Sequence, residues 1–141
     1  MRFRCRALHE AGRIRDICTL IRNNLQADIF ISIHNNSQGE EEFNEYNGTR
    51  VLFSEKRKEK SKPLAQICLE HVLKETGSKD QGLVKGDYVY IVRASKVPVA
   101  LIEVGFMTNE QELEKLASSS YQKKVAKAVY NAIIEALEEG L

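Results

Sequence analysis

The sequence predicts an α/β fold in which helices cover both faces of a mostly parallel β-sheet. Two nearly continuous apolar runs, IFISI at 29–33 and VALI at 99–102, are typical of strands that are buried on both faces. Helical periodicity flanks them, because apolar residues recur every three or four positions before the first run and near the C-terminus. A chain of 141 residues fits one domain, 1–141, with a single core.

The first part of the chain predicts a helix and two strands. An amphipathic helix is expected over 10–26, where the apolar residues are Ile14, Ile17, Cys18, Ile21 and Leu25. The strand at 29–33 follows it. Residues 35–48, NNSQGEEEFNEYNG, are polar and rich in turn formers, which indicates a long loop before a second strand at 49–54.

The second part of the chain predicts two more helices and two more strands. A helix is expected from Pro63 to Gly77, a glycine that suits the position just past a helix end. The segments DYVYIVR (87–93) and VPVALIEV (97–104) are predicted as strands. The last helix is expected from about Tyr121, where apolar residues repeat every four positions.

Composition excludes several functional classes. Lys plus Arg number 21 and Asp plus Glu number 20, so bulk charge does not predict a nucleic-acid partner. No apolar run approaches the ~18 residues of a membrane span, and no signal peptide is recognised at the N-terminus. Three cysteines, Cys5, Cys18 and Cys68, do not form a disulfide framework, and Cys18 and Cys68 are expected to be buried thiols.

Two polar side chains stand at the ends of predicted buried strands. His34 follows IFISI directly, and Glu103 follows VALI. Ligands bind beyond the carboxyl ends of the strands in such sheets, so the pair is a candidate site. In a simpler interpretation His34 is a hydrogen-bonded residue and Glu103 forms a buried salt bridge, for instance with Arg93. A zinc hydrolase would use His34 as a ligand and Glu103 as the base that deprotonates the bound water.

Long segments around both residues resemble the zinc-dependent N-acetylmuramoyl-L-alanine amidases, enzymes of the bacterial cell wall. IFISIHNNS is similar to one family motif, and YIVRASKVPVALIEVGFMTNEQE is similar to a second. YQKKVAKAVYNAIIEAL is similar to the family's C-terminal helix. The resemblance covers the chain from about residue 13 onward, and within the family the chain resembles the sporulation and germination amidases.

The resemblance implies a peptidoglycan substrate, a zinc cofactor, a place in the cell wall outside the membrane, and three site residues. His34 matches the family's last zinc ligand, and Glu103 matches its catalytic glutamate. Arg93 matches an arginine of the second motif and is expected to contact substrate. Gly105 and Phe106 match positions that shape the end of the strand.

The family's first zinc-binding histidine and its second ligand, a glutamate, have no counterpart in this sequence. The N-terminal part of the amidase fold is therefore expected to be missing, which would expose a sheet edge able to drive self-association. His9 with Glu10 lacks the glycine context of the first ligand, and Cys68 with His71 is better explained as a packed thiol and a hydrogen-bonded histidine. Truncation, loss of catalysis, and completion by a partner chain all fit this gap.

Two functions therefore compete. The first is zinc-assisted hydrolysis of the bond between N-acetylmuramic acid and L-alanine, with Glu103 as the base. The second is a catalytically inactive, amidase-like fragment or regulatory protein that binds peptidoglycan or a partner amidase. A nucleotide-binding α/β domain is not supported, because no glycine-rich phosphate loop follows any predicted strand.

Overall fold

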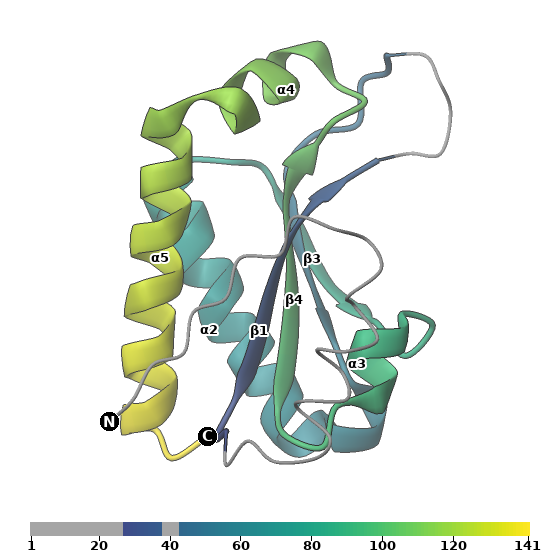
Figure 1. Cartoon of the computed structure of the whole chain (residues 1–141), viewed down its shortest axis with the longest axis vertical. Helices are drawn as coiled ribbons and strands as arrows, with labels where there is room; N and C mark the ends of the chain where they lie inside the picture. The colour runs from purple at the N-terminus through teal and green to yellow at the C-terminus, as the bar shows by residue number, and fades with distance from the viewer. Residues whose placement is uncertain (1–26, 38–42) are drawn as a thin grey trace.

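The computed structural model describes residues 27–37 and 43–141, and in this part of the chain a four-stranded sheet lies between helices on its two faces (Figure 1). The strands are β1 (Phe30–Asn36), β2 (Thr49–Phe53), β3 (Asp80–Lys85) and β4 (Val99–Phe106). The helices are α2 (Lys58–Thr76), α3 (Tyr90–Ala94), α4 (Glu110–Ala117) and α5 (Ser119–Glu138), and a 3₁₀ turn, η2, spans Glu55–Arg57. The predicted α/β fold is confirmed, whereas the helix predicted over 10–26 lies outside the described residues.

The strand order is β1-β4-β2-β3, so β4 lies inside the sheet and β1 at one edge of its described part. β1 pairs in parallel with β4, and β2 pairs in parallel with β3. Only the central pairing, β2 with β4, is antiparallel. The sheet is thus mixed but mostly parallel, as the apolar strands predicted.

One face of the sheet, here called the α5 face, carries most of the core. Helices α2 and α5 pack side by side against it (Figure 1). Alternate strand residues, Val51 and Phe53 of β2 and Ala100 and Ile102 of β4, meet the buried faces of both helices. Burial of this apolar surface is the main force that holds the two helices on the sheet.

The opposite face, here called the α3 face, carries a smaller core. Leu52, Val99 and Leu101 pack there against Ile91 and Val92 of α3. This short helix covers the part of the face where β4 begins (Figure 1). Beyond Leu101 the strand continues past the helix, and the next residue of β4 on this face is Glu103.

The segment DYVYIVR at 87–93 is not a strand, so that prediction was wrong. Residues from Tyr90 form α3, because Ile91 and Val92 fit the core of the α3 face while Tyr88 and Tyr90 remain exposed. A short apolar run of this kind does not distinguish a helical turn from a strand. The strand in this region is β3, which was not predicted because its sequence, DQGLVK, is mostly polar and half of its residues are exposed.

Helix α2 begins at Lys58, earlier than the predicted start at Pro63, and ends as predicted at Gly77. Gly77 has a φ of +70°, and its N–H donates to the Leu73 carbonyl, which is the expected helix cap. Ser61 explains the early start, because its buried Oγ accepts a hydrogen bond from the Val99 N–H. The first turns of α2 are thereby tied to the beginning of β4.

Cys68 and His71 of α2 have structural roles, as predicted. Cys68 is fully buried in the core of the α5 face, and burial raises the pKa of its thiol to about 12. His71 Nε2 lies 2.8 Å from Glu135 Oε2 of α5, which ties the two helices together. Cys5 and Cys18 lie outside the described residues.

We expect the Cys68 thiol to be inert in the folded protein, because a buried thiol with so high a pKa supplies almost no thiolate. In a Cys5→Ser, Cys18→Ser variant, labelling by a thiol-reactive chromophore should be slow in native buffer and immediate in denaturant. The same variant with Cys68→Ser gives the background rate. Fast labelling of Cys68 under native conditions would contradict the packing described here.

Candidate functional site

The parallel pairing of β1 with β4 places His34 directly opposite Glu103. Their Cα atoms are partners in the register, which runs without a break from Phe30 opposite Val99. Both residues belong to the α3 face, because alternate residues of a strand point to the same side. Phe30 shares a side with His34, Val99 and Leu101 share a side with Glu103, and all three pack in the core of the α3 face. The two strand-end residues singled out from the sequence are therefore neighbours.

His34 lies in a half-buried position near the end of β1. Desolvation by burial lowers the pKa of its imidazole, so the neutral form is favoured near pH 7. Its Nε2 lies 2.8 Å from the Oγ of Ser32, two residues earlier on the same face. A neutral imidazole is the form of histidine that binds a metal.

Glu103 is a partly buried carboxylate between two polar neighbours. His34 lies opposite it on β1, and Arg50 is its register partner on β2. Burial raises the pKa of Glu103, and the positive charge of Arg50 acts in the opposite direction. Glu103 Oε2 is buried and has no hydrogen-bond partner in the described structure. An acceptor left without a partner in this way is available to a ligand.

Phe106 reaches the α3 face through an irregularity in β4. His34 pairs with Glu103 but Asn36 pairs with Phe106, so β4 has one more residue than β1 between these pairs. Val104 packs in the core of the α5 face, and a Cβ on Gly105 would also point there, to within 3.3 Å of Leu116 Cδ2. Two successive residues thus face the same side. Such a bulge re-aims the next side chain.

Arg50 lies over the Phe106 ring, a contact that no sequence pattern predicted. Its guanidinium carbon is 5.7 Å from the ring centroid, and the Tyr46 ring stacks on Phe106 with a centroid distance of 6.2 Å. Arg50 stands in an ordinary strand sequence, TRVLF. Only the register of β2 against β4 identifies it as the neighbour of Glu103.

Arg93, the residue expected to contact substrate, lies on α3. Its Nη1 donates to the Asp87 carbonyl at 2.9 Å, and its Cζ lies 5.9 Å from the Tyr90 ring centroid. In the described part of the chain, no hydrogen bond or ion pair joins Arg93 to Glu103. The cation that acts on Glu103 is instead Arg50.

A second buried carboxylate, Glu112 of α4, lies near the same end of β4. Both of its oxygens accept the Gly48 N–H at 3.1 Å, and Oε2 also accepts the Phe106 N–H at 2.8 Å. Glu112 is only 6% exposed. Since backbone donors satisfy this carboxylate, its role is to hold the loop before β2 against the end of β4.

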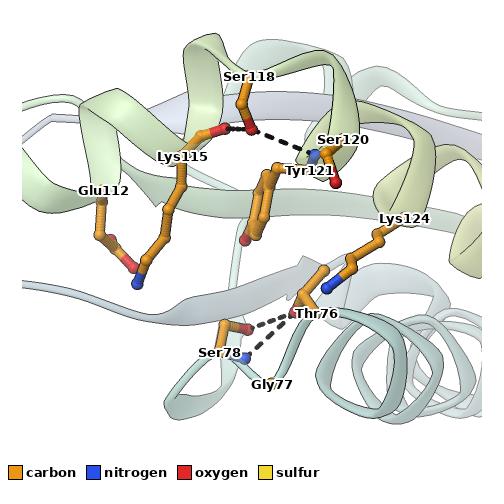
Figure 2. A pocket seen from close by; sticks show the side chains of 9 residues that line it. All are labelled: Thr76, Gly77, Ser78, Glu112, Lys115, Ser118, Ser120, Tyr121 and Lys124. Carbon is orange, nitrogen blue, oxygen red and sulfur yellow. Dashed lines mark hydrogen bonds between the residues drawn. The ribbon is translucent and has the colours of Figure 1, made fainter.

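A hollow of about 260 Å³ lies among α2, α4 and α5, away from His34 and Glu103 (Figure 2). Lys115 and Lys124 extend toward it above Thr76 and Ser78 (Figure 2). Tyr121 lines it and donates its hydroxyl to the Val104 carbonyl at 2.8 Å. Because Val104 packs on the α5 face, this hollow is separate from the strand-end site.

The described residues fit only part of a zinc site. His34 supplies one neutral imidazole, and Glu103 supplies a carboxylate beside it. Within residues 27–37 and 43–141, no group of three His, Cys, Asp or Glu side chains is arranged to hold a metal ion. Catalytic zinc normally has three protein ligands, so His34 and Glu103 do not complete such a site by themselves.

Comparison with known proteins identifies related sequences. A family model described as Amidase_3, N-acetylmuramoyl-L-alanine amidase, matches residues 9–135. The uncharacterized protein YqiI of Bacillus subtilis is 36% identical over 109 residues, which are 77% of this chain and 50% of that protein. The amidase LytC of Bacillus subtilis is 31% identical over 77% of this chain and 21% of its own length. The germination-specific amidase of Bacillus subtilis is 27% identical over 83% of this chain and 48% of its own length.

The crystal structure of an N-acetylmuramoyl-L-alanine amidase from Clostridium difficile 630 has a similar fold. Its TM-score is 0.79 at 29% identity, and the match covers 88% of this chain and 64% of that one. The chain thus spans about half the length of YqiI and less than two thirds of this structure.

We expect Glu112→Gln to lower the free energy of unfolding by about 1–3 kcal/mol, because an amide N–H₂ would face a backbone N–H donor. Urea denaturation followed by circular dichroism measures this loss. Glu114→Gln is the matched control, since Glu114 is exposed on the same helix. Equal stability of the two variants would contradict the role assigned to Glu112.

Proposed function

The chain belongs to the Amidase_3 family of N-acetylmuramoyl-L-alanine amidases, a zinc-dependent family, and from this we propose that it hydrolyses peptidoglycan. The bond cleaved is the amide between N-acetylmuramic acid and L-alanine. The observation that carries the proposal is the direct pairing of His34 with Glu103 at the carboxyl ends of parallel strands. This pairing supports a shared role, because each residue alone has a simpler structural explanation.

In the proposed reaction His34 would help to hold the zinc ion, and Glu103 would take the proton of the attacking water. Zinc bound in such a site lowers the pKa of a water ligand and polarises the scissile carbonyl. Among the described residues His34 would hold the ion, and burial, which lowers the pKa of its imidazole, favours the neutral form with one unprotonated ring nitrogen. Glu103 would accept a proton from the water as the water oxygen bonds to the scissile carbonyl carbon, and would deliver that proton to the L-alanine nitrogen as the C–N bond breaks.

Arg93 is retained as a proposed contact for more distant parts of the substrate. Its side chain is exposed on α3, on the same side of the sheet as His34 and Glu103. A peptidoglycan strand is long enough to contact α3 while its scissile bond lies at the strand ends. Family membership also supports a place of action in the cell wall, outside the membrane, and a subgroup of sporulation or germination amidases is proposed on the same basis.

No described helix is both long and apolar enough to cross a membrane. β1 is the edge strand of the described sheet, and Ile33 on its α5 face is 51% exposed. This surface supports self-association, or contact with other chain segments, through an additional strand.

A second function is favoured by one observation. The described residues lack a three-ligand metal group, which fits an amidase-like protein that binds peptidoglycan or a partner amidase without cutting. Retention of the chain on purified sacculi, without release of free amino groups from them, would favour this function over hydrolysis.

Replacement of Glu103 tests the proposed base. With zinc present, Glu103→Gln should lower the rate of amide hydrolysis by about a hundredfold or more, because general base catalysis is lost. The same variant should still bind sacculi. Glu114→Gln should retain the wild-type rate. Equal turnover by Glu103→Gln and wild type would exclude Glu103 as the base.

A zinc titration by calorimetry tests the role of His34. The proposal predicts binding of one zinc per chain, abolished by His34→Ala, since His34 is the ligand contributed by β1. His71→Ala is the control, because His71 pairs with Glu135 in the interface between α2 and α5. Zinc binding that survives His34→Ala would remove His34 from the metal site.

A further inference from the structure

We propose that Arg50 and Asn36 form a hydrogen-bond-donor subsite that binds carbonyl groups of the peptide part of the substrate, on either side of Glu103. The inference rests on the proposed function and extends it to two residues that the sequence motifs did not single out. The peptide would lie across the end of β4, with one donor supplied by β1 and the other by β2.

The first observation is a group of buried polar atoms without partners. In the described structure Asn36 Nδ2, Arg50 Nε and Glu103 Oε2 are all buried and make no hydrogen bond. Asn36 is only 6% exposed. Native proteins leave few buried polar atoms unpaired, and three on neighbouring strands indicate that a ligand completes them.

The second observation is that the sheet brings these atoms together. Arg50 is the register partner of Glu103, and Asn36 lies two residues beyond His34, which is the other partner. Neighbouring strands are about 4.8 Å apart, so Asn36 and Arg50 flank Glu103 from its two sides. The bulge in β4 turns Phe106 to the same side, opposite Asn36.

The third observation is that Arg50 is held in place. Its guanidinium lies over the Phe106 ring, and Tyr46 stacks on Phe106. Glu112 accepts the backbone N–H of Phe106 and that of Gly48, which lies between Tyr46 and Arg50 in the chain. A donor fixed in this way loses little freedom when it binds a ligand, which favours a substrate contact.

The chemistry of the three atoms matches a peptide. Two unpaired donors require acceptors, and one unpaired acceptor requires a donor. A peptide presents both, as carbonyl oxygens and amide N–H groups. N-acetylmuramic acid without its peptide carries a single acetamide and not the successive amides of a peptide chain. The subsite is therefore assigned to the stem peptide, with Glu103 left free to act on water or on an N–H.

The test is direct observation of the Arg50 side chain by NMR in uniformly ¹⁵N-labelled chain 1–141. Spectra of the arginine Nε–H region are recorded with a metal chelator present, so that no substrate is consumed. The probe is N-acetylmuramyl-L-alanyl-D-isoglutamine, and the comparison ligand is N-acetylmuramic acid, which lacks the peptide. The Arg50 signal is assigned by its absence from Arg50→Lys.

The expected result is a saturable shift of the Arg50 Nε–H signal with the muramyl peptide and none with N-acetylmuramic acid. The dissociation constant of the muramyl peptide should rise about tenfold in Arg50→Ala and in Asn36→Ala. The first variant loses a hydrogen bond from a charged group, and the second loses one from a buried amide. Arg50→Lys should recover part of the loss at Arg50, because it keeps the charge. Lys123→Ala removes an exposed charge from α5 and should bind as wild type does.

Two results would overturn the inference, and they differ in what they say of the proposed function. If backbone signals shift with the muramyl peptide while Arg50 Nε–H does not, the peptide binds elsewhere and the amidase proposal stands. If no signal shifts and the chain is not retained on sacculi, both the subsite and the proposed substrate are wrong for this chain.

Discussion

The pairing of β4 with a strand on each side is the constraint on which the rest of the molecule depends. Its apolar residues form part of the core on both faces, so its position relative to α2, α3 and α5 is fixed by packing. The same strand sets the neighbours of Glu103, because His34 and Arg50 reach that residue only through their registers with β4. A slip of one residue would send every one of these side chains to the opposite face. The core and the site are thus held by the same hydrogen bonds.

The two buried carboxylates differ in whether hydrogen-bond donors of the described protein compensate their charge. Glu112 and Glu103 lie near the same end of β4, and burial of either charge is costly unless it is compensated. Backbone N–H groups compensate Glu112, which therefore holds a loop in place. Glu103 Oε2 has no such partner in the described structure, and its pKa is raised by burial in spite of Arg50. The carboxylate without a partner in the described structure is therefore the one proposed above as the base.

The sequence was informative where periodicity and burial agree, and uninformative where a role depends on register. Continuous apolar runs predicted β1 and β4, and four-residue repeats predicted α5, because each pattern reflects burial of the element itself. DYVYIVR misled because a short segment rich in β-branched and aromatic residues can also form one buried helical turn. β3 was missed because half of its residues are exposed and only Leu83 and Val84 are apolar. No local sequence pattern distinguishes Arg50 and Asn36, because they become neighbours of Glu103 only when β1, β2 and β4 pair.

The bulge at Val104–Gly105 has a consequence for how sequences of this kind should be compared. Up to Glu103 the parity of a residue number in β4 predicts the face to which its side chain points, and from Phe106 onward the parity is reversed. A gap placed in this short stretch of an alignment therefore changes which face an aligned residue is assigned to. In a relative with one residue fewer between the acid and the aromatic ring, the ring would be buried under α4 and α5, and the arginine would lose the surface on which it lies.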